Sequence, residues 1–428
     1  MLFIYNFFVQ IASIVLKFLA LFNPKLKLFV NGRKNVFTQI SNKINSTDKT
    51  IWFHAASLGE YEQGIPVIEA TKLKFPKHKV VLTFFSPSGF EIRKNNTFAD
   101  LTIYLPLDTS ANAKQFLKLV HPELVFFIKY EFWPNYLKEL KSQNIKTYLI
   151  SGIFRENQAF FKWYGGFYRN ALQTFEYFFV QNESSKHLLQ KLGFSNVKVS
   201  GDTRFDRVIS ILKRDTKLGF IEHFISSPTA LGMTSTTLEE IKKTTIVIGS
   251  SWAKDEDLIV KYINNSNDNL KFIIAPHNIN AQQIQELKNS IVPKTILFSE
   301  KENKDLASFK VFIIDTIGIL TKIYSYADIA YVGGGFGNSG VHNILEPATF
   351  GIPIIIGPNY SHFAEVTALV NLNGCISISN QNQLNDALNL LINNSDERAE
   401  KGHICSTFVQ MNKGATEKIL NQISHNFQ

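Results

Sequence analysis

Short, nearly continuous apolar runs constrain the fold of this chain more than any other feature of its sequence. Five such runs recur in the first half, at 51–54, 80–85, 124–128, 147–150 and 177–180. Continuous apolar runs of this length suit strands of a parallel sheet that is covered on both faces, and the segments between them have helical length and pattern. The first half therefore predicts a doubly wound α/β domain.

The same alternation returns in the second half, after a polar connector at 213–243 that is rich in Thr and Ser. Its runs lie at 245–249, 271–275, 311–314, 327–332 and 354–356. A chain of 428 residues is also too long for one ordinary core, so two domains are expected. The predicted fold class is α/β, with two doubly wound, Rossmann-like domains that face a cleft and bind ligands at the carboxyl ends of their strands.

The predicted domain boundaries follow from this alternation. The first domain covers 48–212 and the second covers 240–395. The tail, 396–428, has a helical pattern and is expected to pack back on the first domain. This architecture is typical of nucleotide-sugar glycosyltransferases, although a fold alone does not establish a function.

The N-terminus carries the longest apolar segment of the chain. Residues 2–22 are almost wholly apolar, and as a helix they would extend roughly 30 Å, about the hydrocarbon thickness of a bilayer. Basic residues follow at Lys25, Lys27 and Lys34, so the positive-inside rule keeps the body of the protein in the cytoplasm. We expect a retained membrane anchor over 1–24, either spanning the bilayer or lying in its interface.

Two other interpretations of this segment are weaker. A cleaved signal peptide would have a basic region before the apolar run and a small-residue cleavage site after it, and the sequence has neither. A buried core helix is the second alternative.

Charge and cysteine content limit the partners. A formal net charge of +9 indicates a negatively charged partner. The Lys and Arg residues are scattered and no nucleic-acid motif is present, so an anionic membrane surface is expected instead of nucleic acid. Two cysteines, Cys375 and Cys405, argue against a disulfide framework and for a reducing compartment. No spacing of His, Asp and Glu is typical of a metal site, so no metal is expected.

A glycine-rich stretch follows the run at 327–332. Five glycines within 333–340 allow a sharp turn that brings backbone N–H groups close to an anion. A helix starting near Asn343 would add partial positive charge, and it would place Asn343 and Glu346 on one face. We therefore predict a nucleotide seat, with glycines that include Gly334 and Gly335 at the phosphate and Glu346 at the ribose hydroxyls.

The alternative for this stretch is a turn that only reverses the chain. The glycine spacing matches neither the dinucleotide nor the Walker fingerprint.

Carboxylates follow two strands of the first domain. Glu60 lies where the first strand ends and a helix begins, a position that favours the ionised form. An ionised Glu facing a cleft can act as a general base, although Glu60 can equally be a simple helix cap. Glu131 follows the run at 124–128, and a single Glu there is commonly structural. The two together favour a site.

Three further candidates follow strands of the second domain. Ser250 is placed to bind phosphate and Pro276 to stack on a base, although either can be an ordinary turn residue. His277 by itself is more typical of a surface histidine than of a ligand.

Several ordered motifs resemble one family, the Kdo transferases, which attach 3-deoxy-D-manno-octulosonic acid (Kdo) to a lipid A precursor. The matching stretches are HAASLGE at 54–60, EFWPN at 131–135, GDTRFD at 201–206, GVHNILEP at 340–347 and GP at 357–358. The resemblance runs from the N-terminal anchor to about residue 365. It implies a GT-B glycosyltransferase fold, with an acceptor-binding first domain and a nucleotide-sugar-binding second domain.

The resemblance also implies a reaction. Kdo would pass with inversion from CMP-Kdo to lipid A precursor (lipid IVA) in lipopolysaccharide core biosynthesis, at the cytoplasmic face of the inner membrane. Glu60 would deprotonate the acceptor hydroxyl, with Glu131 as the second catalytic candidate. Ser250, Pro276 and His277 would join the glycine loop in binding the donor, and no metal or other cofactor would be needed.

The chain departs from the family pattern at three places. His277 stands where the family usually has arginine, Tyr130 replaces a usual threonine, and the acidic run after the Ser pair becomes Trp252-Ala253-Lys254-Asp255-Glu256. These departures concern the donor side more than Glu60.

Other functions stay open at this point. They are a GT-B transferase that uses a UDP-sugar with a lipid acceptor, a sugar-nucleotide epimerase of the same fold, and a membrane-tethered nucleotide-binding protein without catalysis. An epimerase would have little use for a membrane segment, and Glu60 together with the Glu346 segment argues against a non-catalytic protein.

Overall fold

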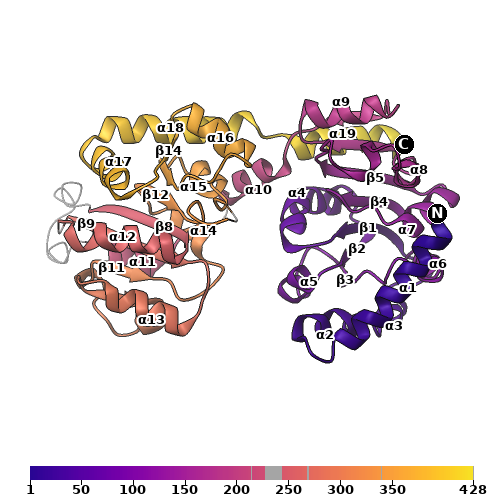
Figure 1. The fold of residues 1–428 in the computed structure, drawn as a ribbon, viewed down its shortest axis with the longest axis horizontal. Coiled ribbons are helices and arrows are strands. Elements are labelled where there is room, and N and C mark those ends of the chain that lie inside the picture. Colours follow the sequence, from indigo (N-terminus) through magenta and orange to yellow (C-terminus); the bar gives the residue numbers. More distant parts are fainter. Residues whose placement is uncertain (214, 227–242, 268, 339, 428) are drawn as a thin grey trace. The chain divides into compact units, whose positions relative to one another are not determined.

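The chain folds into two compact units, which we describe separately. The computed structural model describes residues 1–213, 215–226, 243–267, 269–338 and 340–427 (Figure 1). Unit 1 comprises Met1–Arg207 together with Asn412–Gln428, and unit 2 comprises Val208–Met411.

Unit 1 is built on a seven-stranded parallel sheet in the order β3-β2-β1-β4-β5-β6-β7. The order runs outward from β1 in both directions, which is the doubly wound arrangement that the apolar runs predict. Its strands are β1 (Lys49–Ala55), β2 (His78–Phe84), β3 (Leu101–Tyr104), β4 (Pro122–Ile128), β5 (Lys146–Gly152), β6 (Tyr177–Val180) and β7 (Val197–Val199).

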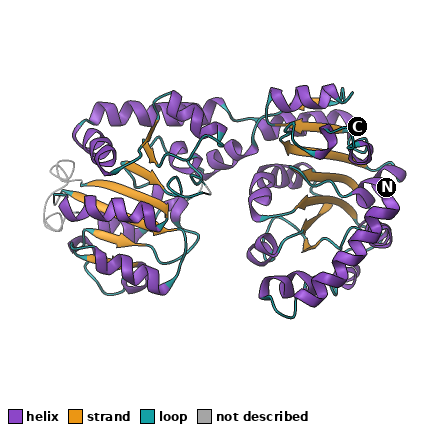
Figure 2. Cartoon of the chain, viewed as in Figure 1, coloured by secondary structure: helices purple, strands orange, loops and turns teal. Residues whose placement is uncertain are grey.

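Helices cover both faces of this sheet, as Figure 2 shows. Alternate strand residues point to opposite faces, so Trp52 packs with Phe116 on one face, whereas Phe53 lies in the core cluster of Ile65 on the other. The helices of unit 1 are α1 (Leu2–Leu19), α2 (Pro24–Asn31), α3 (Val36–Lys43), α4 (Leu58–Lys74), α5 (Pro87–Arg93), α6 (Ser110–Val120), α7 (Pro134–Ser142), α8 (Gly166–Leu172), α9 (Glu183–Lys191) and α19 (Ala415–Phe427). Helix α10 (Thr203–Ile211) is divided between the units, with its residues up to Arg207 in unit 1.

Unit 2 repeats the design with a seven-stranded parallel sheet in the order β10-β11-β9-β8-β12-β13-β14. The two sheets confirm the predicted fold class. The strands are β8 (Thr244–Ser251), β9 (Leu270–Pro276), β10 (Thr295–Leu297), β11 (Val311–Ile313), β12 (Ile329–Val332), β13 (Ile354–Ile356) and β14 (Cys375–Ser377). The helices are α11 (Gly219–Ile225), α12 (Ala253–Asn265), α13 (Ala281–Ser290), α14 (Leu320–Tyr324), α15 (Leu345–Thr349), α16 (Ala364–Asn371), α17 (Gln381–Asn393) and α18 (Ser395–Met411).

The C-terminal tail differs from the expected single element over 396–428. Helix α18 belongs to unit 2, and only α19 packs in unit 1, where Ile419 and Ile423 are buried against α4. The helices are separated before Ala415 at Gly414, whose φ of +99° suits glycine. Asp206 then caps α19 by accepting hydrogen bonds from the N–H groups of Gly414 (2.6 Å) and Thr416 (2.7 Å).

Part of the connector predicted at 213–243 lies within the described residues. Its described part contains α11, whose Ile221 and Phe224 are buried in the core of unit 2, so this part belongs to the second sheet and is not a linker. Residues 227–242 lie outside the described residues.

The N-terminal helix is attached to unit 1 along one side. The Tyr5 hydroxyl donates to Asp108 Oδ2 (2.8 Å), and Asn135 Nδ2 donates to Asn6 Oδ1 (2.8 Å). The opposite side of α1 is apolar and exposed, with Phe3 84% and Phe18 60% exposed. Helix α1 is therefore not a buried core helix.

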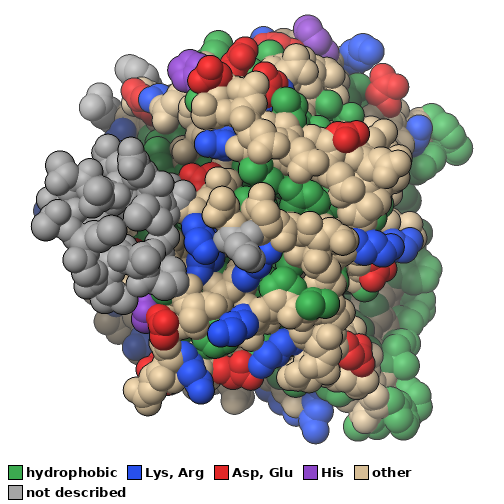
Figure 3. Space-filling model, turned by 90° about the vertical axis from the view of Figure 1, so that its left-hand side faces the viewer, with side chains coloured by type: hydrophobic (Ala, Val, Ile, Leu, Met, Phe, Trp, Pro, Cys, Tyr) green, Lys and Arg blue, Asp and Glu red, His purple; other side chains and the backbone are tan. Residues whose placement is uncertain are grey.

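Charged side chains are mixed over the face drawn in Figure 3. Lys and Arg side chains alternate there with Asp and Glu instead of forming one basic field. This agrees with the scattered basic residues of the sequence.

Candidate functional site

Glu60 lies in the turn that joins β1 to α4. Ser57 is the N-cap of α4, and its Oγ accepts from the Glu60 N–H at 3.5 Å. The Glu60 carboxylate in turn accepts from the Ala56 N–H at 2.5 Å. The cap of α4 is thus Ser57 and not Glu60, and the Ala56 N–H fixes the Glu60 carboxylate at the carboxyl end of β1.

Burial changes the acidity of this carboxylate. Desolvation, followed by the nearby charge of Glu131, raises the pKa of Glu60 to about 7, although the Ala56 N–H and Lys129 act in the opposite direction. The expectation of a permanently ionised Glu60 from its helix-terminal position is wrong, because desolvation outweighs the helix terminus. A pKa near neutrality suits a group that takes up and releases a proton at physiological pH.

Glu131 has hydrogen-bonding partners that Glu60 lacks. Its Oε2 accepts from Trp133 Nε1 (2.9 Å) and lies 3.3 Å from Nε2 of the buried His54. The His54 Nδ1 lies 2.8 Å from Thr83 Oγ1 on the neighbouring strand. Glu131 is therefore held in place by a network, and its charge acts on Glu60 from a fixed position.

The sequence analysis assigned no role to Lys129. It lies between β4 and Glu131 with a φ of +67°, a left-handed conformation that a lysine rarely adopts. Burial lowers the pKa of Lys129, and Glu60 is one of the charges that act on it. The sequence feature that could have indicated a role for Lys129 is its place directly after a strand, beside an acidic motif.

The glycine loop of unit 2 depends on glycine for its geometry. Gly334 has a φ of +95°, and a Cβ atom there would lie 2.6 Å from the Gly340 carbonyl oxygen. A Cβ atom on Gly335 would lie 2.7 Å from Gly357 Cα. Glycine is required at both positions by backbone contacts within the protein, whatever ligand the loop binds. Ser339 of this loop lies outside the described residues.

Asp255 organises this loop from the first turn of α12. It is buried, and it accepts from the Tyr331 hydroxyl (2.7 Å), the Gly334 N–H (2.9 Å) and the Trp252 N–H (3.0 Å). The Gly334 N–H is therefore engaged by a carboxylate of the protein. Asp255 had no predicted role, because its partners Tyr331 and Gly334 are far away along the chain.

Three rings stack beside the loop. Trp252 and His277 have ring centroids 4.5 Å apart, and His277 and His342 are 4.4 Å apart. Trp252 Nε1 donates to His342 Nε2 at 2.9 Å, and burial lowers the pKa of both histidines. His277 is exposed, yet it belongs to this stack, so it is more than an isolated surface histidine.

The segment after the loop differs from the predicted helix start. Helix α15 begins at Leu345 and has five residues, so it adds little of the helix dipole expected near Asn343. Asn343 Nδ2 donates to Glu346 Oε1 at 3.3 Å, and Thr321 Oγ1 donates to Glu346 Oε2 at 2.7 Å. The two predicted residues are indeed neighbours, and Glu346 is a partly exposed acceptor.

Two cavities adjoin these residues. One of about 250 Å³ lies between Trp252, Lys254 and the loop glycines Gly334 and Gly337. It combines a lysine with the first turn of the 13-residue helix α12, which is chemistry suited to a phosphate, and Asp255 also lines it. Lys254 was another residue to which the sequence analysis gave no role.

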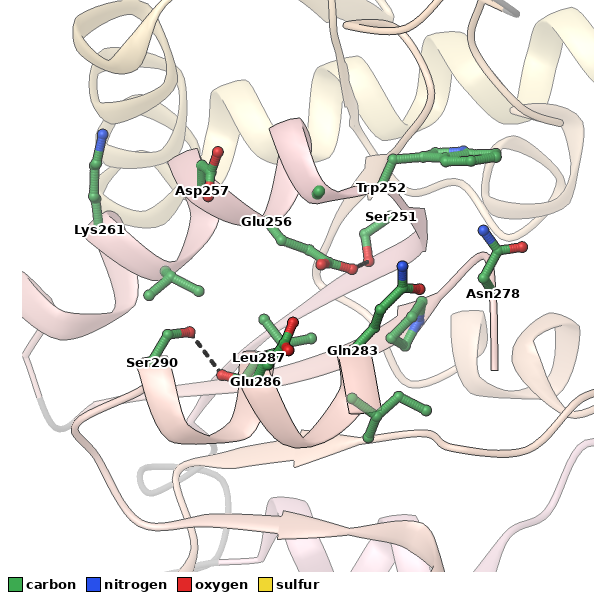
Figure 4. A pocket seen from close by; sticks show the side chains of 14 residues that line it. Ser251, Trp252, Glu256, Asp257, Lys261, Asn278, Gln283, Glu286, Leu287 and Ser290 are labelled. Atoms are coloured by element: carbon green, nitrogen blue, oxygen red, sulfur yellow. Dashed lines mark hydrogen bonds between the residues drawn. The ribbon is translucent and has the colours of Figure 1, made fainter. Parts of the chain in front are cut away.

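The second cavity, of about 500 Å³, lies between α12 and α13 (Figure 4). Pro276 lines it, as do the carboxylates Glu256 and Glu286, and Ser251 Oγ donates to Glu256 Oε1 at 2.8 Å. Carboxylates accept hydrogen bonds from amino and hydroxyl groups, so this cavity suits a base or sugar better than a phosphate. Ser250 has a φ of +54° and directly precedes Ser251 in the chain.

The family comparison covers most of unit 1, including Glu60 and Glu131. A family model described as 3-deoxy-D-manno-octulosonic-acid transferase (kdotransferase) matches residues 31–207. The 3-deoxy-D-manno-octulosonic acid transferase of Chlamydia trachomatis serovar D is 28% identical over 368 residues, which are 82% of this chain and 80% of that protein. Residues 31–207 thus match the Kdo transferase family, and the similarity to its full-length members extends over most of the chain.

Other comparisons agree. A Kdo transferase of Haemophilus influenzae is 26% identical over 389 residues, covering 87% of this chain and 86% of that protein. Two solved structures share the fold. One is UDP-GlcNAc 2-epimerase from Neisseria meningitidis bound to UDP-GlcNAc, with a TM-score of 0.58 and 16% identity over 88% of this chain and 100% of that chain. The other is MurG from Acinetobacter baumannii, with a TM-score of 0.53 and 12% identity over 88% of this chain and 99% of that chain. These likenesses concern the fold alone and confirm the GT-B class.

The two predicted catalytic residues, Glu60 and Glu131, lie inside the segment that the family model matches. The donor-side predictions, from Ser250 to Glu346, lie beyond that segment, within the range shared with full-length relatives.

Proposed function

We propose that this protein transfers Kdo from CMP-Kdo to a lipid A precursor with inversion, and that Glu60 is the general base. The family relationship supports the reaction class. The observation that carries the mechanism is the Glu60 carboxylate, which is held after the end of β1 and has its pKa raised to about 7. Such a group accepts a proton from an attacking hydroxyl at neutral pH and releases it afterwards.

The reaction is a displacement at the anomeric carbon of Kdo. The acceptor hydroxyl loses its proton to Glu60, and its oxygen forms the new glycosidic bond. The bond from the anomeric carbon to the CMP phosphate oxygen breaks, and the electron pair leaves with that oxygen. In the proposal, Lys254 and the N-terminus of α12 stabilise the phosphate, as preorganised positive charge does at a developing anion.

The remaining donor contacts are assigned by chemistry. Glu346 accepts hydrogen bonds from ribose hydroxyls, beside Asn343. The cavity lined by Pro276 and Glu256 receives the base. His277 stacks on Trp252, which also lines this cavity, and so helps to position the cavity wall. The proposal assigns no step to a metal ion, and the absence of a metal requirement stays a prediction.

Membrane attachment forms part of this proposal. Helix α1 is long and apolar enough to cross a membrane by length and composition. It is nevertheless bound along its side to unit 1 through Tyr5 and Asn6, and its exposed apolar residues lie on the other side. This one-sided packing favours a helix that lies in the membrane interface over one that spans the bilayer. The proposed location is the cytoplasmic face of the inner membrane.

Incubation with CMP-Kdo and a lipid A precursor, followed by mass spectrometry of the lipid, tests the function. The expected product is the acceptor enlarged by Kdo, and Glu60→Gln protein is the control. Parallel reactions with UDP-GlcNAc test the remaining GT-B alternative. Transfer from UDP-GlcNAc alone, or from neither donor, would overturn the proposal.

A further inference from the structure

Unit 1 contains a cavity of about 770 Å³ between the C-terminal half of α1, helices α2 and α3, and the loop after β3. These helices are the indigo segments of Figure 1. Much of its wall is apolar, with contributions from Leu16, Val30, Phe37, Pro106 and Leu107. The volume lies within the range of about 300–1,000 Å³ that small-molecule sites occupy.

The charge of this cavity has one sign. Lys17, Lys27 and Lys34 line it, and none of the residues that line it is Asp or Glu. Three ammonium groups beside an apolar wall suit an amphiphile that has an anionic group next to a hydrocarbon chain.

Arg33 also belongs to the lining, but its guanidinium is committed to the protein. It donates to the carbonyl oxygens of Phe29 (2.8 Å), Leu105 (2.9 Å) and Phe85 (2.5 Å), and burial lowers its pKa to about 9. Arg33 therefore fixes the wall of the cavity to the ends of β2 and β3, and the three lysines supply the charge for a ligand.

Part of the cavity wall lies at the same edge of the sheet as Glu60. The Pro106–Leu107 wall follows β3 and Glu60 follows β1, with β2 between them. Neighbouring strands lie about 4.8 Å apart, so the two strand ends are roughly 10 Å apart across the sheet.

Direct contacts link the cavity wall to the acidic pair. Arg33 binds the Phe85 carbonyl, and the Phe85 ring lies 4.5 Å from the Trp133 ring. Trp133 donates to Glu131, the carboxylate that raises the pKa of Glu60. The partly exposed side chains of Phe85 and Trp133 thus connect the cavity wall to the acidic pair.

We propose that this cavity binds one acyl chain of the acceptor lipid, with an acceptor phosphate at Lys17, Lys27 and Lys34. The inference rests on the proposed function, because the acylated and phosphorylated acceptor comes from it. The acceptor is favoured over a bilayer phospholipid because the cavity lies on the Glu60 edge of the sheet. Each methylene buried there contributes about fourfold in affinity.

The first test fills the cavity. Ser13→Phe places a ring on the lining face of α1, and Ile14→Phe is the matched control, because Ile14 is 68% exposed on the outward face. Turnover is measured in detergent micelles with the acylated acceptor and with the same phosphorylated acceptor freed of its acyl chains. Ser13→Phe is expected to raise KM for the acylated acceptor at least about tenfold, with kcat/KM for the deacylated acceptor unchanged, and Ile14→Phe changes neither.

The second test removes charge. Lys27→Ala is compared with Lys25→Ala, because Lys25 lies on the same helix but not in the cavity. Both are surface changes that leave the fold intact. Lys27→Ala is expected to raise KM several-fold for the phosphorylated acceptor but not for a dephosphorylated one, and Lys25→Ala is expected to change neither.

Equilibrium binding of the acylated acceptor is measured alongside turnover. If the wild-type protein transfers nothing from CMP-Kdo, the proposed function fails, but weaker acceptor binding by Ser13→Phe still supports the cavity. An equal effect of Ser13→Phe on acylated and deacylated acceptors overturns the inference. So does an effect confined to sedimentation with anionic phospholipid vesicles, which would assign the cavity to bilayer lipid.

Discussion

The raised pKa of Glu60 predicts a specific pH dependence of catalysis. Only the ionised carboxylate can accept the acceptor proton, so kcat/KM should rise with pH through a limb at about 7. With that pKa, about a tenth of the carboxylate is ionised at pH 6 and about nine tenths at pH 8, so the rate should rise roughly tenfold. A carboxylate of ordinary pKa would leave the rate nearly constant over this range.

The neighbouring charges determine which variant tests this reasoning. Burial is the larger cause of the raised pKa and the charge of Glu131 is the second, whereas Lys129 lowers it. Glu131→Gln removes the repulsion and leaves the burial, so the limb should move to lower pH without reaching the ordinary carboxylate range. The ratio of rates at pH 8 and pH 6 should therefore be smaller in Glu131→Gln than in the wild type.

The assay is the initial rate of Kdo transfer at limiting acceptor, from pH 5.5 to 8.5 at constant ionic strength. Saturating CMP-Kdo keeps the titration of His277 and His342 on the donor side from limiting the rate. Glu60→Gln is the control, and it should lose at least about 100-fold in turnover and the limb at pH 7. A limb at pH 7 that persists in the residual activity of Glu60→Gln, or a flat wild-type profile, would refute the assignment of Glu60.

Three further predictions concern stability, the donor and the membrane. The pKa of Glu60 in the folded protein exceeds its unfolded value near 4.5, so the contribution of Glu60 to stability falls as pH rises through about 7. In thermal unfolding, Glu60→Gln should therefore be more stable than the wild type at pH 8 but not at pH 4. Glu346→Ala should weaken CMP binding by about 1–3 kcal/mol in calorimetric titration, and unchanged affinity in a folded variant would leave Glu346 without a ribose contact. The pair Phe7→Glu and Phe18→Glu should abolish sedimentation with anionic vesicles, whereas Gln10→Glu should not; retained binding of the pair would contradict the interfacial helix.

Much of the candidate site was accessible from the sequence because of sheet geometry. Glu60 and Glu131 follow β1 and β4, which are neighbours in the sheet, and carboxyl ends of parallel strands meet at one edge. The pairing of Asn343 with Glu346 followed from their spacing. The properties that give these residues a chemical role depend on burial and on distant partners, such as Trp133 for Glu131 and Asp255 for the glycine loop.

The sequence by itself determined the central strands and the fold class, because a strand covered on both faces must be continuously apolar over several residues. The strands it missed are β3, β7, β10 and β14, which are the four edges of the two sheets. Edge strands have one neighbour and are three or four residues long here, so their apolar signal is too short to separate from a loop.

Tertiary structure alone decided the rest. Helix α1 has a composition that fits a bilayer span, but its hydrogen bonds to Asp108 and Asn135 place it along the side of unit 1. Glu60 has a sequence position that favours an ionised carboxylate, but burial raises its pKa to about 7. Apolar periodicity is a local property that a sequence displays directly, whereas desolvation and hydrogen bonding depend on residues that only folding brings together.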